Sequence, residues 1–340
     1  MGKNKKDFWD ERSRKIGRKK KRIKHYRSGK TAVPNNGRVT ENQCEPDFLC
    51  EAPSCFSFTY NLDETARFFS KMMRYFKNGA LESIFFIDSR YVTVVTTDVI
   101  MYLIAIMRNY KLAKKRLYSF YGTYPDDGLA KKVYYESGLL KFVKSKSKEL
   151  PPNTEKISIM AGKSNDSRAA GKMCDFVAKK FDLQRGRTSE LYNVIIEMMS
   201  NVYYHAYDPK EEIMKAEWYM YAEHVDDEIK FVFLDTGLGI GKTVKKHSLY
   251  EKVTSKIGIG SESRLIKSAL DGDFRTQTQK HNHGKGLPSI NEFAYNSQIK
   301  DFHIISGGGH CWLESVTDDF KCEDLKNRIN GTIYCFTIKR

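Results

Sequence analysis

Three polar side chains recur at every fourth position of an otherwise apolar stretch, at Glu197, Asn201 and His205. On a helix this spacing places all three on one face. A carboxylate there could act as a general base, and an amide oxygen could bind a hard cation. The same row is equally typical of a helix edge that faces water, since buried polar groups need partners. The row alone does not decide between these interpretations.

A second candidate group lies at the end of a predicted strand. Residues 231–234 are apolar and lead directly into Asp235, which is followed by Gly237 and Gly239. A carboxylate fixed at a strand end can accept a hydrogen bond from a buried amino group. The two glycines allow a ligand to approach the backbone closely. Together with the polar row, this arrangement favours a binding site.

In these stretches the chain resembles the GHKL ATPase superfamily, which includes gyrase, the histidine kinases and MutL-type repair proteins. The resemblance covers roughly residues 156–340, and its motifs occur in the order that the family has. They are an N-box at Glu197-x-x-x-Asn201, a D-x-G-x-G-I box at 235–240, a second glycine box at 283–287 (HGKGL) and a last box at Gly331-Thr332.

The resemblance implies an α/β sandwich of the Bergerat type that binds ATP and Mg²⁺. In it Asp235 would pair with the adenine amino group with support from Thr332, and Asn201 would be the protein ligand of Mg²⁺. Glu197 would be the catalytic base, and His205 would orient the nucleotide. The resemblance also implies nucleotide contacts from the glycine boxes and their neighbours, namely Gly237, Gly239, Ile240, Gly284, Lys285, Gly286 and Leu287.

Residues 237–243 (GLGIGKT) also look like a P-loop, which is a different phosphate-binding motif. A P-loop needs four residues between its first glycine and the Gly-Lys pair. Counting from Gly237 leaves only three residues before Gly241. We therefore interpret this stretch as the strand-end box.

The positive charge of the chain is concentrated in its first residues. The formal net charge is +16, and residues 1–30 contribute +11 of it, with fourteen Lys or Arg against three Asp or Glu. We predict a basic tail and linker over residues 1–47, whose cations could neutralise nucleic-acid phosphates. A solvated arm without specificity is the alternative.

Composition also indicates the cellular setting. The longest apolar run, around residues 92–107, contains several polar residues and is too polar to span a bilayer. No apolar stretch follows the basic N-terminus, so no signal peptide is predicted. Seven scattered cysteines, an odd number, favour free thiols in a reducing cytoplasm.

Strand and helix patterns alternate over residues 48–145 and predict a first α/β sandwich. A helix over 62–78 precedes a buried strand over 81–89, and an apolar helix follows a hydroxyl-rich turn at Thr96 and Thr97. This order resembles a STAS-type domain, the fold of anti-sigma-factor antagonists, and the resemblance implies a phosphoacceptor at Thr96 or Thr97. The alternative is that these residues cap the helix.

A charged linker is predicted over residues 146–155, and the ATPase-like domain over 156–340. Within it we expect a helix over 167–181, an antiparallel strand pair that turns at 225–227, and a helix over 287–294. Residues 241–283 are long, polar and basic, and we predict a loop that closes over nucleotide as a lid.

The favoured interpretation is a cytoplasmic Mg-ATP-binding ATPase that acts as a nucleotide-gated regulatory switch of a regulatory or defence-associated kind. Its partners would be ATP, nucleic acid through residues 1–30, a protein through the STAS-like domain, and a second copy in a nucleotide-dependent homodimer; no membrane contact is expected. The alternatives are an anti-sigma-type Ser/Thr kinase that acts on a STAS domain and a non-catalytic ATP-binding scaffold. A histidine kinase is disfavoured because no His precedes an acidic residue and Pro at phosphoacceptor spacing.

Overall fold

The computed structural model describes residues 48–78, 82–114, 117–137, 139, 153–184, 186–206, 217–257, 260–274 and 286–340. The predicted basic tail, residues 146–152 of the predicted linker, and Gly284 and Lys285 lie outside these ranges. The chain has the mixed α/β fold that the sequence predicted. Within the described ranges, no helix combines the length and the apolar character that crossing a bilayer requires.

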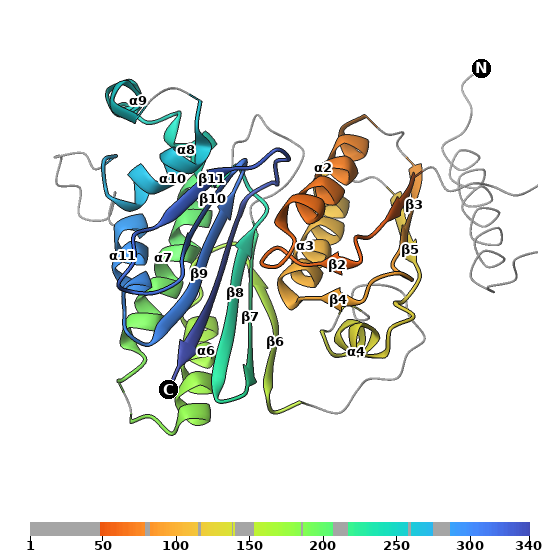
Figure 1. The fold of residues 1–340 in the computed structure, drawn as a ribbon, viewed down its shortest axis with the longest axis horizontal. Coiled ribbons are helices and arrows are strands. Elements are labelled where there is room, and N and C mark those ends of the chain that lie inside the picture. Colours follow the sequence, from red (N-terminus) through yellow and green to blue (C-terminus); the bar gives the residue numbers. More distant parts are fainter. Residues whose placement is uncertain are drawn as a thin grey trace, which may run out of the picture.

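A seven-stranded sheet forms the centre of the C-terminal half, residues 153–340, and all its neighbouring strands are antiparallel (Figure 1). The hairpin at Asp226 and Asp227 confirms the predicted turn; both residues have positive φ, which Asp tolerates better than most residues. In spatial order the strands are β11 (Lys321–Asp324), β10 (Gly309–Leu313), β9 (Ile299–Ser306), β12 (Thr332–Lys339), β8 (Glu228–Asp235), β7 (Trp218–Val225) and β6 (Lys156–Gly162).

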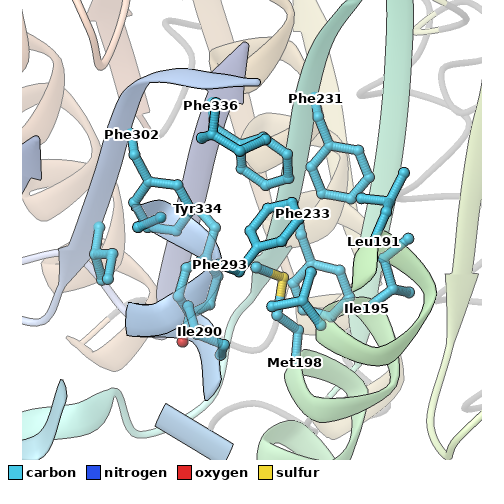
Figure 2. Close-up of a cluster of buried hydrophobic side chains, with 14 of the residues drawn as sticks. Leu191, Ile195, Met198, Phe231, Phe233, Ile290, Phe293, Phe302, Tyr334 and Phe336 are labelled. Atoms are coloured by element: carbon cyan, nitrogen blue, oxygen red, sulfur yellow. The ribbon is translucent and has the colours of Figure 1, made fainter. Parts of the chain in front are cut away.

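Helices cover one face of this sheet. They are α6 (Ser167–Phe181), α7 (Ser189–His205), α10 (Glu262–Leu270) and α11 (Gly286–Ala294). The bounds of α6 are those predicted, and Asp166 caps the helix by accepting hydrogen bonds from the Arg168 and Ala169 amides. Figure 2 shows aromatic side chains of the strands, among them Phe231 and Phe336, packed with Leu191 of α7 and Phe293 of α11. Burial of this face holds α7 against the sheet.

The described residues of the N-terminal half, residues 48–139, form helices and two smaller sheets. The helix predicted over 62–78 has those observed bounds. All neighbouring strands in the larger of these sheets, which has three strands, are parallel. The elements are β1 (Phe48–Glu51), β2 (Cys55–Phe56), α2 (Leu62–Asn78), β3 (Glu82–Asp88), β4 (Val94–Val95), α3 (Thr97–Lys114), β5 (Leu117–Gly122) and α4 (Gly128–Glu136).

Helices α2 and α3 lie between the three-stranded sheet and the seven-stranded sheet, on the face of the seven-stranded sheet opposite α7 (Figure 1). Every residue from Val99 to Met107 is buried, as expected of a helix that is apolar on all sides. One hydrophobic cluster joins these helices to strand residues of the C-terminal half, which include Tyr219, Leu234 and Ile333. The two halves therefore share a core.

The predicted lid loop over residues 241–283 is wrong for most of its length. The segment contains α8 (Ile240–Val244), α9 (Tyr250–Ile257) and α10. Ser261 caps α10, and Leu265, Ile266 and Leu270 pack into the core at helical spacing. The segment as a whole is polar, so the short amphipathic pattern of α10 was not recognised in the sequence. The edge strand β11 was not predicted at all.

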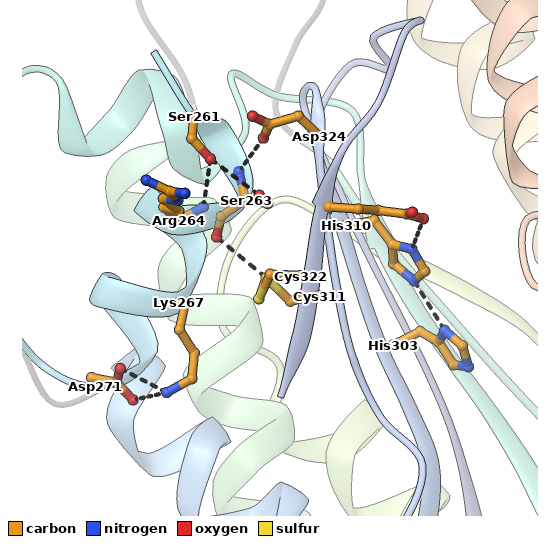
Figure 3. Close-up of a disulfide and its surroundings, with 11 residues drawn as sticks. Ser261, Ser263, Arg264, Lys267, Asp271, His303, His310, Cys311, Cys322 and Asp324 are labelled. Carbon is orange, nitrogen blue, oxygen red and sulfur yellow. Dashed lines mark hydrogen bonds and ion pairs between the residues drawn. A yellow bond between two sulfur atoms is a disulfide. The ribbon is translucent and has the colours of Figure 1, made fainter. Parts of the chain in front are cut away.

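The expectation of free thiols is wrong for two cysteines. Cys311 and Cys322 face each other across the antiparallel pair β10–β11 and form a disulfide (Figure 3). They lie eleven positions apart in sequence, and the pairing of β10 with β11 brings them together. Among the described residues the other cysteines, Cys50, Cys55, Cys174 and Cys335, are free thiols.

Candidate functional site

The polar row of α7 lies where the helix leaves the core. The opposite side of α7 is buried through residues such as Ile195, Met198 and Val202. Glu197 and Asn201 are half-buried, and His205 is exposed near the end of the helix. The row is thus neither a core feature nor a fully solvated edge.

A pocket opens beside this row, between the end of α7, the ends of β8 and β12, and helix α8. The space between these elements is about 450 Å³ when the open mouth of the pocket is counted. Seven of the predicted site residues line it: Asn201, His205, Asp235, Gly239, Ile240, Leu287 and Thr332. They come from four stretches of sequence, so the fold gathers the predicted motifs into one cavity.

Asp235 is the buried carboxyl of this pocket, with only 4% of its surface exposed. Burial raises its pKa to about 6, although hydrogen bonds from the Gly237 amide and from the Thr332 backbone and hydroxyl oppose that rise. The Gly237 amide lies 2.7 Å from Oδ1. A partly satisfied carboxyl in an apolar pocket is suited to accept a hydrogen bond from a ligand.

The loop after Asp235 is tied to the end of α7. The Leu238 amide donates to the Ala206 carbonyl at 3.0 Å, and Gly237 lies so close to Ala206 that a side chain there would collide with it. This close approach sets the width of the pocket between the helix and the strand.

Gly286, the first residue of α11, lies against the polar row. A methyl group added there would be 2.8 Å from Asn201 Oδ1 and 3.1 Å from Glu197 Oε2. The Asn201 Nδ2 atom is buried and has no hydrogen-bond partner among the described residues. An unsatisfied polar atom in a pocket calls for a water or a ligand.

Sequence reasoning missed several residues that shape the pocket, among them Ser306, Thr243 and Tyr334. Ser306 at the end of β9 accepts a hydrogen bond from the Ile240 amide at 2.8 Å and lies 2.9 Å from the Thr332 hydroxyl. Thr243 and Tyr334 line the cavity. Tyr334 was predictable, because it lies two residues beyond Thr332 on one strand and therefore faces the same side. Ser306 carried no such signal.

Thr96 and Thr97 lie away from the pocket, at the start of α3 on the other face of the sheet. Thr97 is buried, and the Thr96 Oγ1 atom is buried as well. Asp98 is fully buried and accepts a hydrogen bond from the Phe58 amide at 3.1 Å. The structure therefore does not bring the predicted phosphoacceptors to the other site residues.

No protein-family model matches this chain, and no curated protein is significantly similar to it. Across the described ranges, no group of three or more His, Cys, Asp or Glu side chains is arranged to hold a metal ion. The chemistry of the site is therefore inferred from the geometry of its own residues.

Proposed function

We propose that this chain is an ATP-binding protein of the GHKL type that uses Mg-ATP to switch conformation in the cytoplasm. The observation that carries the proposal is the meeting of four sequence-distant motifs in one pocket around the buried carboxyl of Asp235. An antiparallel sheet with helices on one face agrees with a Bergerat-type sandwich in the C-terminal half. The parallel β1-β3-β5 sheet and its helices support a STAS-like domain in the N-terminal half.

Adenine recognition would rest on Asp235. Its carboxylate can accept the hydrogen bond of the exocyclic amino group, and the Gly237 amide, which donates to Oδ1 at 2.7 Å, holds the carboxylate in place. Thr332 lines the same pocket. Met198, Val202 and Ile240 provide apolar walls for a flat ring. Guanine carries an oxygen in place of that amino group, so the site should reject it.

Glu197 and Asn201, in the polar row of α7, would lie beside the phosphates of the nucleotide. The side-chain oxygen Oδ1 of Asn201 would be the protein ligand of Mg²⁺. The buried Nδ2 atom, which has no partner among the described residues, could donate a hydrogen bond to a phosphate oxygen. When bound, Mg²⁺ neutralises phosphate charge. Glu197, one turn earlier, is the candidate base that would take the proton of an attacking water. Gly286 leaves room beside both side chains.

Hydrolysis or plain binding suits the fold better than phosphotransfer within the chain. Thr96 and Thr97 are buried on the opposite face of the sheet, so α3 would have to leave the sheet before either hydroxyl could react. Phosphorylation of a separate STAS partner would need no such movement. The kinase and scaffold alternatives therefore become outcomes of the experiment below.

The test is calorimetric titration of the full chain with Mg-ATP and Mg-GTP, followed by incubation with γ-labelled ATP. We expect saturable binding of ATP alone and release of free labelled phosphate. Label on the protein would indicate a kinase, and binding without turnover would indicate a scaffold. Absence of ATP binding would refute the proposal.

Two variants locate the site. Asp235→Asn should abolish ATP binding, because its amide presents a donor where the adenine amino group needs an acceptor, and Glu197→Gln should bind ATP without hydrolysing it. The matched controls are Asp227→Asn, in the exposed β7–β8 turn, and Glu292→Gln, on the exposed side of α11. Unchanged ATP affinity in Asp235→Asn would mean that the adenine site is elsewhere.

A further inference from the structure

We propose that Tyr102 of α3 is a positioning residue through which the N-terminal half holds the nucleotide pocket in its binding geometry. The inference rests on the proposed function and adds a means of regulating it. Whatever moves α3 away from the sheet would loosen the pocket, and bound nucleotide would in turn strengthen the docking of α3.

The contact is a pair of hydrogen bonds between one hydroxyl and one backbone residue. The Tyr102 hydroxyl donates to the Asn330 carbonyl and accepts from the Asn330 amide, each at 2.8 Å. The two atoms belong to the same residue, so the hydroxyl fixes both the position and the orientation of the backbone at Asn330. Such a contact restrains a turn more than a single bond does.

The Tyr102 ring is held by the N-terminal half. Its centroid lies 4.7 Å from that of Phe69 and 5.2 Å from that of Phe58, both in edge-to-face geometry. The side chain is completely buried. The ring therefore moves with α2 and α3, and its hydroxyl transmits their position to Asn330.

The Asn330 turn forms part of the pocket wall. The next residue, Gly331, has φ of 79°, and a side chain there would collide with the Asp235 carbonyl. The residue after it, Thr332, lines the pocket together with Asp235, and its hydroxyl lies 2.9 Å from that of Ser306. On the other side of the turn, the Ile329 amide donates to the Gly307 carbonyl at 2.9 Å. A shift of Asn330 would therefore displace the groups that hold Asp235.

A further polar contact of α3 with the C-terminal half lies away from the pocket. Arg108 lies 3.6 Å from the buried Glu217. Glu217 directly precedes β7, which is two strands away from β12 in the sheet. This contact attaches the halves, whereas the Tyr102 contact links α3 to the pocket itself.

Coupling of this kind is reciprocal. If docking of α3 favours the geometry that binds nucleotide, nucleotide must favour docking of α3 by the same factor. The loss of one well-placed hydroxyl is expected to change affinity by roughly 5- to 10-fold.

The experiment compares Tyr102→Phe with Tyr134→Phe in the full chain. Tyr134 is a matched control because it is also buried in the N-terminal half, and its hydroxyl bonds to Ser89 instead of the sheet. We expect Tyr102→Phe to weaken Mg-ATP binding about 5- to 10-fold and to speed hydrogen exchange of the Asn330 amide at least about tenfold. Tyr134→Phe should do neither.

The outcomes separate this inference from the proposed function. Failure of the wild-type chain to bind ATP would refute the proposed function, and unchanged exchange at Asn330 in Tyr102→Phe would independently refute the contact. ATP binding of equal strength in wild type and Tyr102→Phe would overturn the coupling. If Tyr102→Phe does not fold, the reciprocal effect decides: ATP should slow hydrogen exchange in α3 of the wild-type chain, and no change there would overturn the inference.

Discussion

At the scale of single residues, the chemistry of the site depends on the balance of forces at Asp235. Burial disfavours the ionised carboxylate and raises its pKa to about 6, while hydrogen bonds from Gly237 and Thr332 favour the ionised form. The group therefore titrates within reach of neutral pH. It can accept two hydrogen bonds per oxygen when ionised, but it becomes partly a donor when protonated.

ATP affinity should consequently depend on pH. The raised pKa means that the folded chain takes up a proton at Asp235 as pH falls through about 6. Since adenine needs the acceptor, binding should weaken below that pH by up to about tenfold per pH unit. Titrations between pH 5 and 8 measure this, with the thermal transition as a control for folding. A flat profile would contradict the role of Asp235.

Protonation of Asp235 should affect the stability of the fold in the opposite direction to its effect on ATP binding. Because the pKa of Asp235 is raised above its ordinary value, its ionised form is disfavoured in the folded chain, and this group stabilises the fold more as pH falls through about 6. The contributions of Asp235 to ATP binding and to stability should thus change in opposite directions over that pH interval.

At the scale of elements, the start of α11 is pressed against the polar row of α7. Gly286→Ala should displace the side chains of Asn201 and Glu197, since the added methyl group would be 2.8 Å and 3.1 Å from their oxygens. We expect ATP turnover to fall at least about tenfold, because misplaced catalytic groups lose rate steeply. Steady-state phosphate release measures this.

The control for that substitution is Gly128→Ala. Gly128 begins α4, and an added methyl there meets nothing within 4 Å. It should leave turnover and folding unchanged. Equal turnover in Gly286→Ala and wild type would show that the close approach of α11 to α7 has no part in the reaction.

Helix α10 is an anchored element and not a lid. The buried Glu262 accepts a hydrogen bond from the Gly308 amide at 2.6 Å and pairs with Arg328, and the Ser263 amide donates to Asp324 at 2.8 Å. Figure 3 shows this last contact beside the Cys311–Cys322 disulfide, while His303 and His310 lie on the other side of the strands. The helix is thus tied to β10, β11 and the loop before β12.

Glu262→Ala should destabilise the chain. It would leave the Gly308 amide without its acceptor in a buried place, which costs about 1–3 kcal/mol. Urea unfolding measures the change in the free energy of unfolding. Glu251→Ala, on the exposed side of α9, is the control and should be nearly neutral. Equal unfolding midpoints in the two variants would show that Glu262 does not anchor α10.

At the scale of the whole molecule, the two halves are joined by a common core. Residues of β7, β8 and β12, including Tyr219, Leu234 and Ile333, lie in one cluster with α2 and α3. We expect a single cooperative unfolding transition, because neither half can keep this surface buried alone. Residues 153–340 expressed separately should aggregate. Two separate calorimetric transitions would contradict the shared core.

The proposed nucleic-acid contact belongs to residues 1–30. Their net charge of +11 should release counterions from a nucleic acid, so binding should weaken linearly with log salt concentration. Removing these residues should lower affinity and flatten that dependence, as measured by fluorescence anisotropy with a labelled oligonucleotide. Unchanged affinity in the truncated chain would refute the contact.

Local sequence was sufficient to predict much of the scaffold. Helices α2 and α6 were predicted at their observed bounds, because capping and apolar spacing are properties of neighbouring residues. The grouping of Asp235 with Asn201 and Thr332 was also predicted, but only from the resemblance of their motifs to a family. Spacing along the chain says nothing of distances between segments 30 to 130 residues apart.

Tertiary structure alone decided the rest. The short amphipathic pattern of α10 became a core helix because the sheet offered it an apolar face, and Cys311 and Cys322 met because β11 pairs with β10. The burial of Thr96 and Thr97 and the Tyr102–Asn330 contact arise from the packing of α3 on the sheet. Local sequence determined most of the helices and strands, such as α2 and α6, since these depend on near neighbours, whereas α10 and β11 depend on the sheet against which they pack. Packing determined which side chains can act together, since that depends on surfaces that meet only in the folded chain.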